Sequence, residues 1–517
     1  MISPFPRMSS IWLIGAGFMA FAYFFAASGL GQQSKTADDK QKTDGPKPLV
    51  YGVKTCAGCH SLANPNDTRG LPPVLCRCNE ALIWDKEDKH KLAYTNVFKP
   101  GGRGEQIVKL LNYSKQDTEK NCVVCHGIYI PEDKLNALTD STFKRDQSEG
   151  VSCVACHGAY EDWIDPHGSS VERKRREWRQ LSRQTKQEKY GMTDLWDPAK
   201  RTQVCASCHI GNLESGKVVT HAMYAAGHPP LPSFEISTFS DAMPRHWQYL
   251  YEKTAEAKKL LDYDPAVLEK TQLLIIGGVT ELEASLNLLA GLAENCKQAK
   301  APEDRALDLA AFDCYACHHD LKTPSWRQAR GYSGKPGRPQ FRPWPTALAP
   351  LALLPGEKSD FGSGQEKLST LHAAFDSRPF GEPSRVAGAA RDLQRLCGLL
   401  QGKLSRSSSS FNESAVPRSL QQLCALAAEQ TPDYDSARQL AWAFRVLYDD
   451  LKPKPAKDAL IQERLKLLNQ ELNLELPAGQ QKQILSDLPA VLANIANYDP
   501  EKFKELFGEL SRLLHEK

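Results

Sequence analysis

Five copies of the pentapeptide Cys-x-x-Cys-His constrain this chain more than any other feature. They are Cys56-Ala-Gly-Cys59-His60, Cys122-Val-Val-Cys125-His126, Cys153-Val-Ala-Cys156-His157, Cys205-Ala-Ser-Cys208-His209 and Cys314-Tyr-Ala-Cys317-His318. In this pentapeptide two thiols, one helical turn apart, add to the vinyl groups of a porphyrin, and the following imidazole binds the iron. Random order of the same composition would give roughly 0.01 such pentapeptides. The sequence therefore predicts five covalently bound c-type haems.

The charge balance argues against nucleic acid as a partner. The formal net charge is +3, and each ferric haem with its two propionates adds about −1, which brings the loaded protein near −2. Five haems within residues 56–318 would replace much of the local side-chain core. We therefore expect little sheet and a mainly α, irregular haem-packed domain.

The N-terminal segment predicts where the protein works. Residues Ile11 to Leu30 carry no charge, follow Arg7, and are long enough to cross a bilayer. A cleavable signal normally has a shorter apolar core, although Ala26-Ala27-Ser28-Gly29 offers cleavage context. We favour an uncleaved anchor in the bacterial cytoplasmic membrane. Either interpretation places the bulk of the chain in the periplasm, the side on which haem is attached to such motifs.

Changes of composition along the chain predict five segments. They are a membrane anchor or signal segment at 1–31, a polar tether at 32–50, a pentahaem cytochrome c domain at 51–323, a Pro/Gly-rich connector at 324–365 and a helical domain at 366–517. Between the fourth and fifth motifs, an apolar stripe predicts a long helical stretch in which Gly277-Gly278 favours a break. A helical hairpin there would bring the fifth haem back to the others.

The last 150 residues or so read as a helical bundle. Three sets of apolar residues recur at i, i+4 and i+7 spacing, which is the period of a helix with one buried face. The sets are Leu440, Phe444 and Leu447, then Ile461, Leu465, Leu468 and Leu472, then Phe503, Leu506, Leu510 and Leu513. This region contains no further haem motif, and nothing in it indicates catalysis.

Five cysteines lie outside the motifs. They are Cys76, Cys78, Cys296, Cys397 and Cys424. In an oxidising compartment Cys397 and Cys424 can bridge two helices, whereas Cys76-Arg-Cys78 is too close in sequence for a relaxed disulfide. A redox-active Cys76/Cys78 pair is the alternative for that short motif.

The histidines outside the motifs decide what each haem can do. A haem with histidine on both faces passes electrons, whereas a haem with an open face can bind and reduce a small molecule. The candidates for a second ligand are His90, His167, His221, His228, His246, His319, His372 and His515. We expect the last two, in the helical tail, to be ordinary surface or hydrogen-bonded side chains.

One stretch of the sequence resembles a known family. The string Gly150-Val-Ser-Cys153-Val-Ala-Cys156-His157-Gly158, with His167 ten residues further on, is similar to the core of a family of multihaem cytochromes c. This family includes the tetrahaem electron acceptor of hydroxylamine oxidoreductase from nitrifying bacteria. The resemblance covers roughly residues 50–235. It implies that His167 crosses over to cap the first haem, on His60.

The same resemblance implies that His90 caps the third haem, on His157, although His90 lies further from the first motif than its counterpart in the family. The block Thr220 to Pro229 resembles a later ligand block of the family, so we assign His221 and His228 to the fourth and fifth haems without deciding the order. If the residues between them are helical, they share one face. The second haem, on His126, remains without a distal ligand, as in the nitrifier protein. The predicted iron ligands are His60, His126, His157, His209, His318, His90, His167, His221 and His228.

Three functions fit these features. The first is a membrane-tethered, periplasm-facing pentahaem cytochrome c that relays electrons between redox proteins of a respiratory or nitrogen/sulfur chain. The second is a multihaem reductase of a small nitrogen or sulfur species at an open His126 haem, although the chain has no Cys-x-x-Cys-Lys variant. The third is a structural subunit that docks through its helical tail. We favour an electron carrier over an enzyme.

Overall fold

The computed structural model describes most of the chain beyond the N-terminal segment. The described residues are 52–62, 75–130, 148–159, 162–300, 305–329, 335–352, 358–429, 433–451, 455–474 and 488–515. The predicted anchor at Ile11 to Leu30 and the polar tether lie outside them. Helices dominate these residues, and their only β contacts are two isolated bridges, Asn212 to Lys217 and Phe312 to Phe341. The prediction of a mainly α fold is confirmed.

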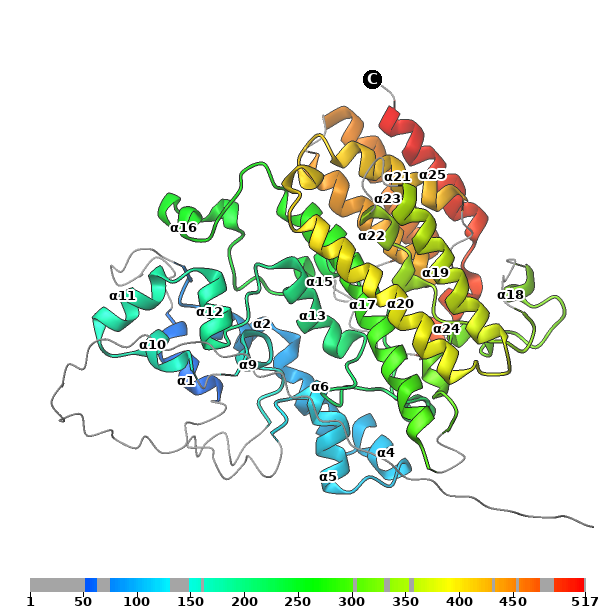
Figure 1. The fold of residues 1–517 in the computed structure, drawn as a ribbon, viewed down its shortest axis with the longest axis horizontal. Coiled ribbons are helices and arrows are strands. Elements are labelled where there is room, and N and C mark those ends of the chain that lie inside the picture. The colour runs from blue at the N-terminus through cyan, green and yellow to red at the C-terminus, as the bar shows by residue number, and fades with distance from the viewer. Residues whose placement is uncertain are drawn as a thin grey trace, which may run out of the picture. The chain divides into compact units, whose positions relative to one another are not determined.

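Short helices carry the first four motifs (Figure 1). Those before the long helix are α1 Val53–His60, α2 Glu80–Glu87, η1 Lys89–Leu92, α3 Ala93–Phe98, α4 Arg103–Leu110, α5 Lys115–Thr118, η2 Glu119–Val123, α6 Val124–His126, α9 Cys153–His157, α10 Ile164–Gly168, α11 Glu172–Gln180, α12 Arg183–Tyr190, α13 Pro198–His209, α14 His221–Ala225, α15 Ile236–Ala242, η3 Leu250–Glu252 and α16 Ala255–Leu260. Most are too short to be stable alone, since an isolated helix of fewer than about 12 residues is marginal in water. Contacts outside each helix must therefore stabilise it.

The long helix α17, Glu269–Gln298, runs without interruption through Gly277 and Gly278. The expected break and helical hairpin are therefore wrong. The two glycines serve close packing instead: an added Cβ would lie 2.2 Å from Ile236 Cγ2 at Gly277 and 2.8 Å from Leu348 Cβ at Gly278. Because tertiary packing supplies most helical stability, two glycines that allow a close approach do not end the helix.

Helix α17 is also long and apolar enough to cross a membrane, but most of its apolar window is buried inside the fold. Leu274, Val279, Leu286 and Ala290 are fully or almost fully buried there. A core helix that packs on all sides passes the same length and composition test. The burial accounts for the composition of α17 without a membrane.

The C-terminal helices share one apolar core with α17, and α20 packs along it (Figure 1). They are α19 Lys358–Asp376, α20 Pro383–Leu404, α21 Val416–Glu429, α22 Tyr434–Asp450, α23 Pro455–Leu472, α24 Leu488–Asn497 and α25 Pro500–His515. The predicted stripes face this core: Phe444, Ile461 and Phe503 are fully buried. Cys397 and Cys424 are both buried as free thiols.

The described residues between α17 and α19, which include the fifth motif, form short turns. They are η5 Leu309–Ala311, η6 Cys314–Ala316, α18 Trp326–Ala329, η7 Trp344–Thr346 and η8 Ala349–Ala352. Arg342 in this segment donates to the carbonyl oxygen of Ala310 at 2.6 Å, and Leu351 is buried against the helical core. The boundaries that we expect at 323 and 365 stay predictions.

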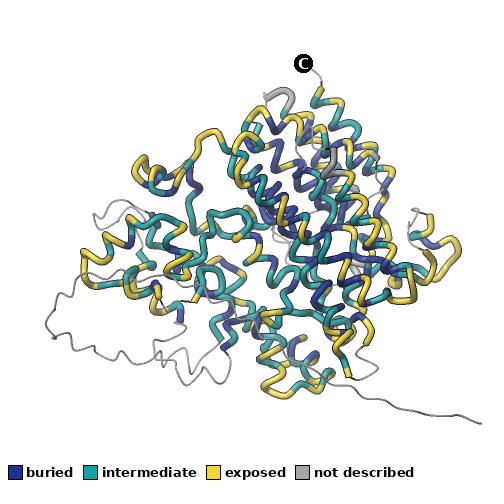
Figure 2. The backbone as a smooth tube through the Cα atoms, in the orientation of Figure 1, coloured by how far each residue is buried: buried dark blue, intermediate teal, exposed yellow. Residues whose placement is uncertain are grey.

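Burial differs between the motif segments and the long helices (Figure 2). Helix α1 has no buried residue, and Val154 is the single buried residue of α9, whereas the buried residues of α22 include Phe444 and most of its neighbours. Short helices that carry thiols but little side-chain core need another apolar body to pack against. A porphyrin beside each motif, as the sequence predicts, would supply that body.

Candidate haem sites

Each motif is presented by a helical turn. Helices α1, α6, α9 and α13 end on the motif histidines His60, His126, His157 and His209, and the fifth motif begins with η6. None of the ten motif cysteines is joined in a disulfide. Helical spacing places the two thiols of a motif about one turn apart, as thioether attachment requires. The local structure thus fits covalent haem attachment at every motif.

A haem iron bound by two histidines sets a definite distance between their rings. Each iron–nitrogen bond is about 2.0 Å, and each ring centre lies about 1.1 Å beyond its nitrogen, so the ring centres are roughly 6.2 Å apart. A pair of imidazoles held at this distance, one from a motif and one from elsewhere, therefore fits a haem between them.

The first motif has such a pair. The ring centres of His60 and His167 lie 5.9 Å apart, with 17° between the ring planes. His167 comes from α10, where Trp163 and Trp178 pack against its ring. The structure thus brings His167 to the first motif, where the family resemblance also places it.

The second motif is also paired, which the sequence did not predict. The ring of His228 lies 6.2 Å from that of His126 at an angle of 67°. Helix α14 ends at Ala225, and Gly227 adopts a left-handed φ of 109°. The chain therefore turns before His228, so His221 and His228 do not share a helical face. His228 Nδ1 donates to its neighbour's carbonyl, Pro229 O, at 2.7 Å.

The fourth motif is paired with His90. The ring centres of His209 and His90 lie 6.4 Å apart, with 89° between the planes. The resemblance implied that His90 would face His157 of the third motif, and the structure differs. The residues between the first motif and His90 include α2, and the cap of η1 by Asp88 then fixes His90 in place. This longer segment brings the imidazole of His90 to the fourth motif instead of the third.

The fifth motif is paired with His221. The ring centres of His318 and His221 lie 6.4 Å apart, with 29° between the planes. His221 is the first residue of α14, and its backbone N–H donates to Asp308 Oδ1 at 2.9 Å. This bond ties the distal ligand to the segment that leads into the fifth motif.

For the third motif, the neighbouring non-motif imidazole is that of His246. Burial lowers the pKa of His157 to about 4, and the next largest contribution comes from the nearby His246. The buried Nδ1 of His246 has no hydrogen-bond partner among the described residues. In the sequence His246 is one of eight candidate ligands, and no local pattern assigns it to a motif because it lies far from all five.

The remaining histidines do not join these pairs. His319 Nδ1 bonds to the backbone oxygen of Asp320 at 2.8 Å. His372 lies in α19 and His515 at the end of α25, both in the region without motifs. Their positions agree with the expectation that the tail histidines are ordinary side chains.

Burial keeps most of these imidazoles neutral, which is the form that binds metal. It lowers the pKa of His126 and His209 to about 4 and that of His167 to about 3, each with a further contribution from the paired ring. For His60 and His90, burial also lowers the pKa, but hydrogen-bonded carboxylates raise it overall.

Those carboxylates are Glu80 and Asp88. Glu80 Oε2 lies 2.7 Å from His60 Nδ1, and Asp88 Oδ1 lies 2.9 Å from His90 Nδ1. Such partners orient the ring of a metal-bound histidine and make it a stronger donor. Burial opposes the ionised form of both acids, but the imidazole partners lower the pKa of each below its usual value.

Motifs that are distant in sequence also touch one another. The thiol of Cys153 hydrogen-bonds to Cys56, and the thiol of Cys125 hydrogen-bonds to Cys208. The first motif is thus adjacent to the third, and the second to the fourth. Haems held at these motifs would be close neighbours.

Comparison with known proteins finds one family whose model matches part of the chain. Residues 73–158, which contain the second and third motifs and His90, match the family described as cytochrome c554 and c-prime. No curated protein and no solved structure matches the chain. The match supports a c-type cytochrome with covalently bound haem that transfers electrons and works with redox proteins. It does not extend to the first, fourth and fifth motifs, to His167 or to the C-terminal helices.

Proposed function

We propose that this chain is a pentahaem c-type cytochrome that relays electrons between redox proteins. The observation that carries the proposal is the pairing of motif and non-motif histidines: four pairs have ring centres 5.9 to 6.4 Å apart, and His246 neighbours His157 of the third motif. Bound haem supplies an iron that cycles between ferric and ferrous states. Two imidazoles on every iron leave no face for a substrate.

The residues of the chain have three tasks in this function. The motif cysteines hold each porphyrin, the paired histidines bind both faces of each iron, and the contacts between motifs keep neighbouring porphyrins close. His228 is decisive for the choice between carrier and enzyme. Its position opposite His126 at 6.2 Å supports a capped second haem and so weighs against a reductase site there.

We further propose that Ile11 to Leu30 anchors the chain in the cytoplasmic membrane and that the haem domain faces the periplasm. The support is the uncharged length of this segment and the export that haem attachment requires. The anchored protein should stay with membranes through a high-salt wash and be released by detergent. Mature protein that begins near Ser28 in the soluble periplasm would contradict the anchor.

Electron paramagnetic resonance of the oxidised protein, with a haemochrome assay, tests the proposed function. We expect five haems per chain, all low-spin. The nearly perpendicular rings of His90 and His209 predict a strongly anisotropic low-spin signal, and the nearly parallel rings of His60 and His167 a rhombic one. Four or fewer haems in mature protein, or a full high-spin haem that binds nitrite or nitric oxide, would contradict the relay.

A further inference from the structure

Two cysteines outside the haem motifs lie side by side at the first motif. Cys76 Sγ and Cys78 Sγ are 3.5 Å apart, in the segment that leads into α2. Both side chains are half-buried and both are free thiols. The two sulfur atoms are thus in contact, and a disulfide would bring them to about 2.05 Å.

The backbone around this pair is held in an unusual conformation. Cys78 has a φ of 59°, which is uncommon for a residue with a side chain. Its carbonyl oxygen accepts a hydrogen bond from the N–H of Leu62 at 2.8 Å, just beyond the end of α1. The buried Lys253 donates to Leu75 O at 2.9 Å, and its charge interacts with Cys76. Such strain persists where surrounding contacts impose it, often at functional sites.

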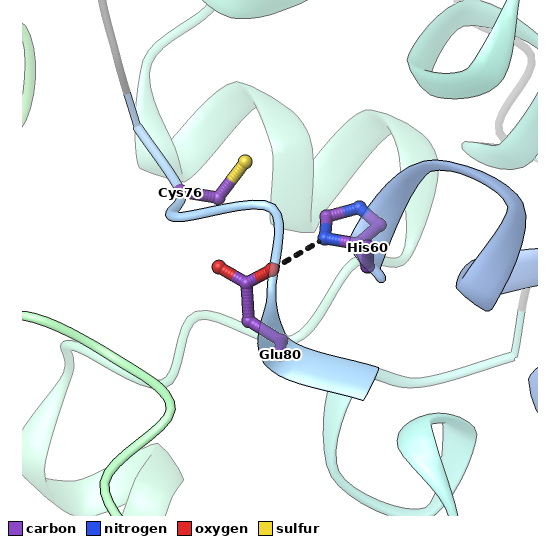
Figure 3. Close-up of side chains that lie close together, drawn as sticks. All are labelled: His60, Cys76 and Glu80. Atoms are coloured by element: carbon purple, nitrogen blue, oxygen red, sulfur yellow. Dashed lines mark hydrogen bonds and ion pairs between the residues drawn. The ribbon is translucent and has the colours of Figure 1, made fainter. Parts of the chain in front are cut away.

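One carboxylate links the thiol pair to the predicted iron ligand of the first motif (Figure 3). Glu80 Oε1 accepts the backbone N–H of Arg77 at 2.6 Å and that of Cys78 at 3.2 Å, while Oε2 bonds to His60 Nδ1. Cys76 Sγ, a ring nitrogen of His60 and a carboxylate oxygen of Glu80 all lie within 4.8 Å of one another. The thiol of Cys76 is thus within 4.8 Å of a ring nitrogen of His60, the predicted iron ligand.

The same cluster has the donors of a metal site, but its donors are already in use. His60 Nδ1 bonds to Glu80, and the other oxygen of Glu80 accepts two backbone N–H groups. The sulfur atoms of Cys76 and Cys78 remain as donors without another such partner among the described residues, and they face each other. Thiol–disulfide chemistry is therefore the better interpretation of this arrangement.

We propose that Cys76 and Cys78 form a dithiol–disulfide pair that exchanges electrons with the haem held by His60. This inference rests on the proposed function. Oxidation breaks two S–H bonds, forms one S–S bond, and releases two protons to solvent and two electrons. Two ferric haems each take one of these electrons. The pair thereby connects one-electron haem chemistry with two-electron thiol chemistry, and its outside partner would be a thiol or a disulfide.

A disulfide across one intervening residue closes a small, strained ring. Strained disulfides have more oxidising potentials than relaxed ones and are the labile, regulatory or catalytic kind. A disulfide of this pair would therefore be reduced more easily than a structural disulfide.

Thiol trapping at controlled potential tests the proposal. The holoprotein is held at an oxidising or a reducing electrode with mediators, labelled with N-ethylmaleimide under denaturing conditions, digested with trypsin and analysed by mass spectrometry. Trypsin cleaves after Arg77. In the oxidised sample we expect peptides 70–77 and 78–86 joined by a disulfide, and in the reduced sample two labelled peptides. Labelled thiols in both samples would overturn the proposal.

Electron counting provides a second readout that does not depend on activity. Full reduction of the wild-type holoprotein should take two more electrons per chain than that of the Cys76→Ser/Cys78→Ser variant. Cys296→Ser is the matched control, because Cys296 is buried and donates to Ala306 O, and it should titrate like the wild type. Equal electron counts for the wild type and the double serine variant would overturn the proposal. So would a stoichiometric bound zinc that protects both thiols.

The haemochrome assay separates this inference from the proposed function. Haem content and low-spin spectra should be the same in the wild type and in the serine variants. If haem is bound and the thiols never join, only the thiol inference fails. If mature protein lacks haem at the first motif, the proposed function fails as well.

Discussion

The hydrogen bond between His60 and Glu80 should set the potential of the first haem. Glu80→Gln removes the negative charge but keeps the shape and an oxygen acceptor 2.7 Å from Nδ1. The side chains of His60 and Glu80 are only 21% and 19% exposed, so solvent screens this charge little. A negative partner strengthens the imidazole as a donor and stabilises ferric iron over ferrous iron.

The size of the effect follows from the type of hydrogen bond. A bond to a charged group contributes about 1.5–3 kcal/mol and a neutral one about 1 kcal/mol, so the substitution loses roughly 0.5–2 kcal/mol of preference for the ferric state. Since about 1.4 kcal/mol corresponds to 59 mV for one electron, the potential of this haem should rise by roughly 20–90 mV.

Spectroelectrochemical titration of the α band, fitted to five one-electron steps, measures this shift. One step should move upward and the other four should stay in place. The control is Glu105→Gln, because Glu105 is exposed and pairs only with Lys109 and the backbone of Gly101. If all five potentials of Glu80→Gln match the wild type at unchanged haem content, Glu80 does not act on the haem and our reasoning is refuted.

Three further outcomes follow from the structure. His228→Ala should convert the haem of the second motif to a high-spin form that binds carbon monoxide when reduced; an unchanged spin count would remove His228 as its ligand. Gly277→Ala should lower the free energy of unfolding by roughly 1–3 kcal/mol, because the new Cβ would lie 2.2 Å from Ile236. The exposed Gly388→Ala, with nothing within 4 Å, should instead leave stability unchanged or raise it slightly in the same denaturant titration; equal losses would contradict the packing argument. Burial raises the pKa of Asp433 to about 7, and the negative charge of Asp435 is the next largest cause. The folded state then keeps a proton that the unfolded chain releases above about pH 4, so this contribution to stability is lost as the pH rises toward 7. Asp433→Asn should flatten that part of the dependence of Tm on pH, and an unchanged slope would contradict it.

Sequence alone determined the parts of this protein whose physical basis is local. Thioether attachment needs two thiols and an imidazole within five residues, so the motifs can be read directly. The helical period is also local, and residues such as Leu440, Phe444 and Leu447 are buried as their spacing predicts. Local rules failed at Gly277, where helix propensity favours a break but the close approach of Ile236 makes a glycine necessary.

Tertiary structure decided which second histidine faces which motif. His90 faces the fourth motif and not the third, His228 faces the second, and His246 neighbours the third. Each of these contacts joins residues far apart in the chain, and the path between them depends on inserted segments such as α2. A coordination bond constrains two atoms in space but not the number of residues between them, so no spacing rule can assign the pairs. The packing of the whole chain selects them.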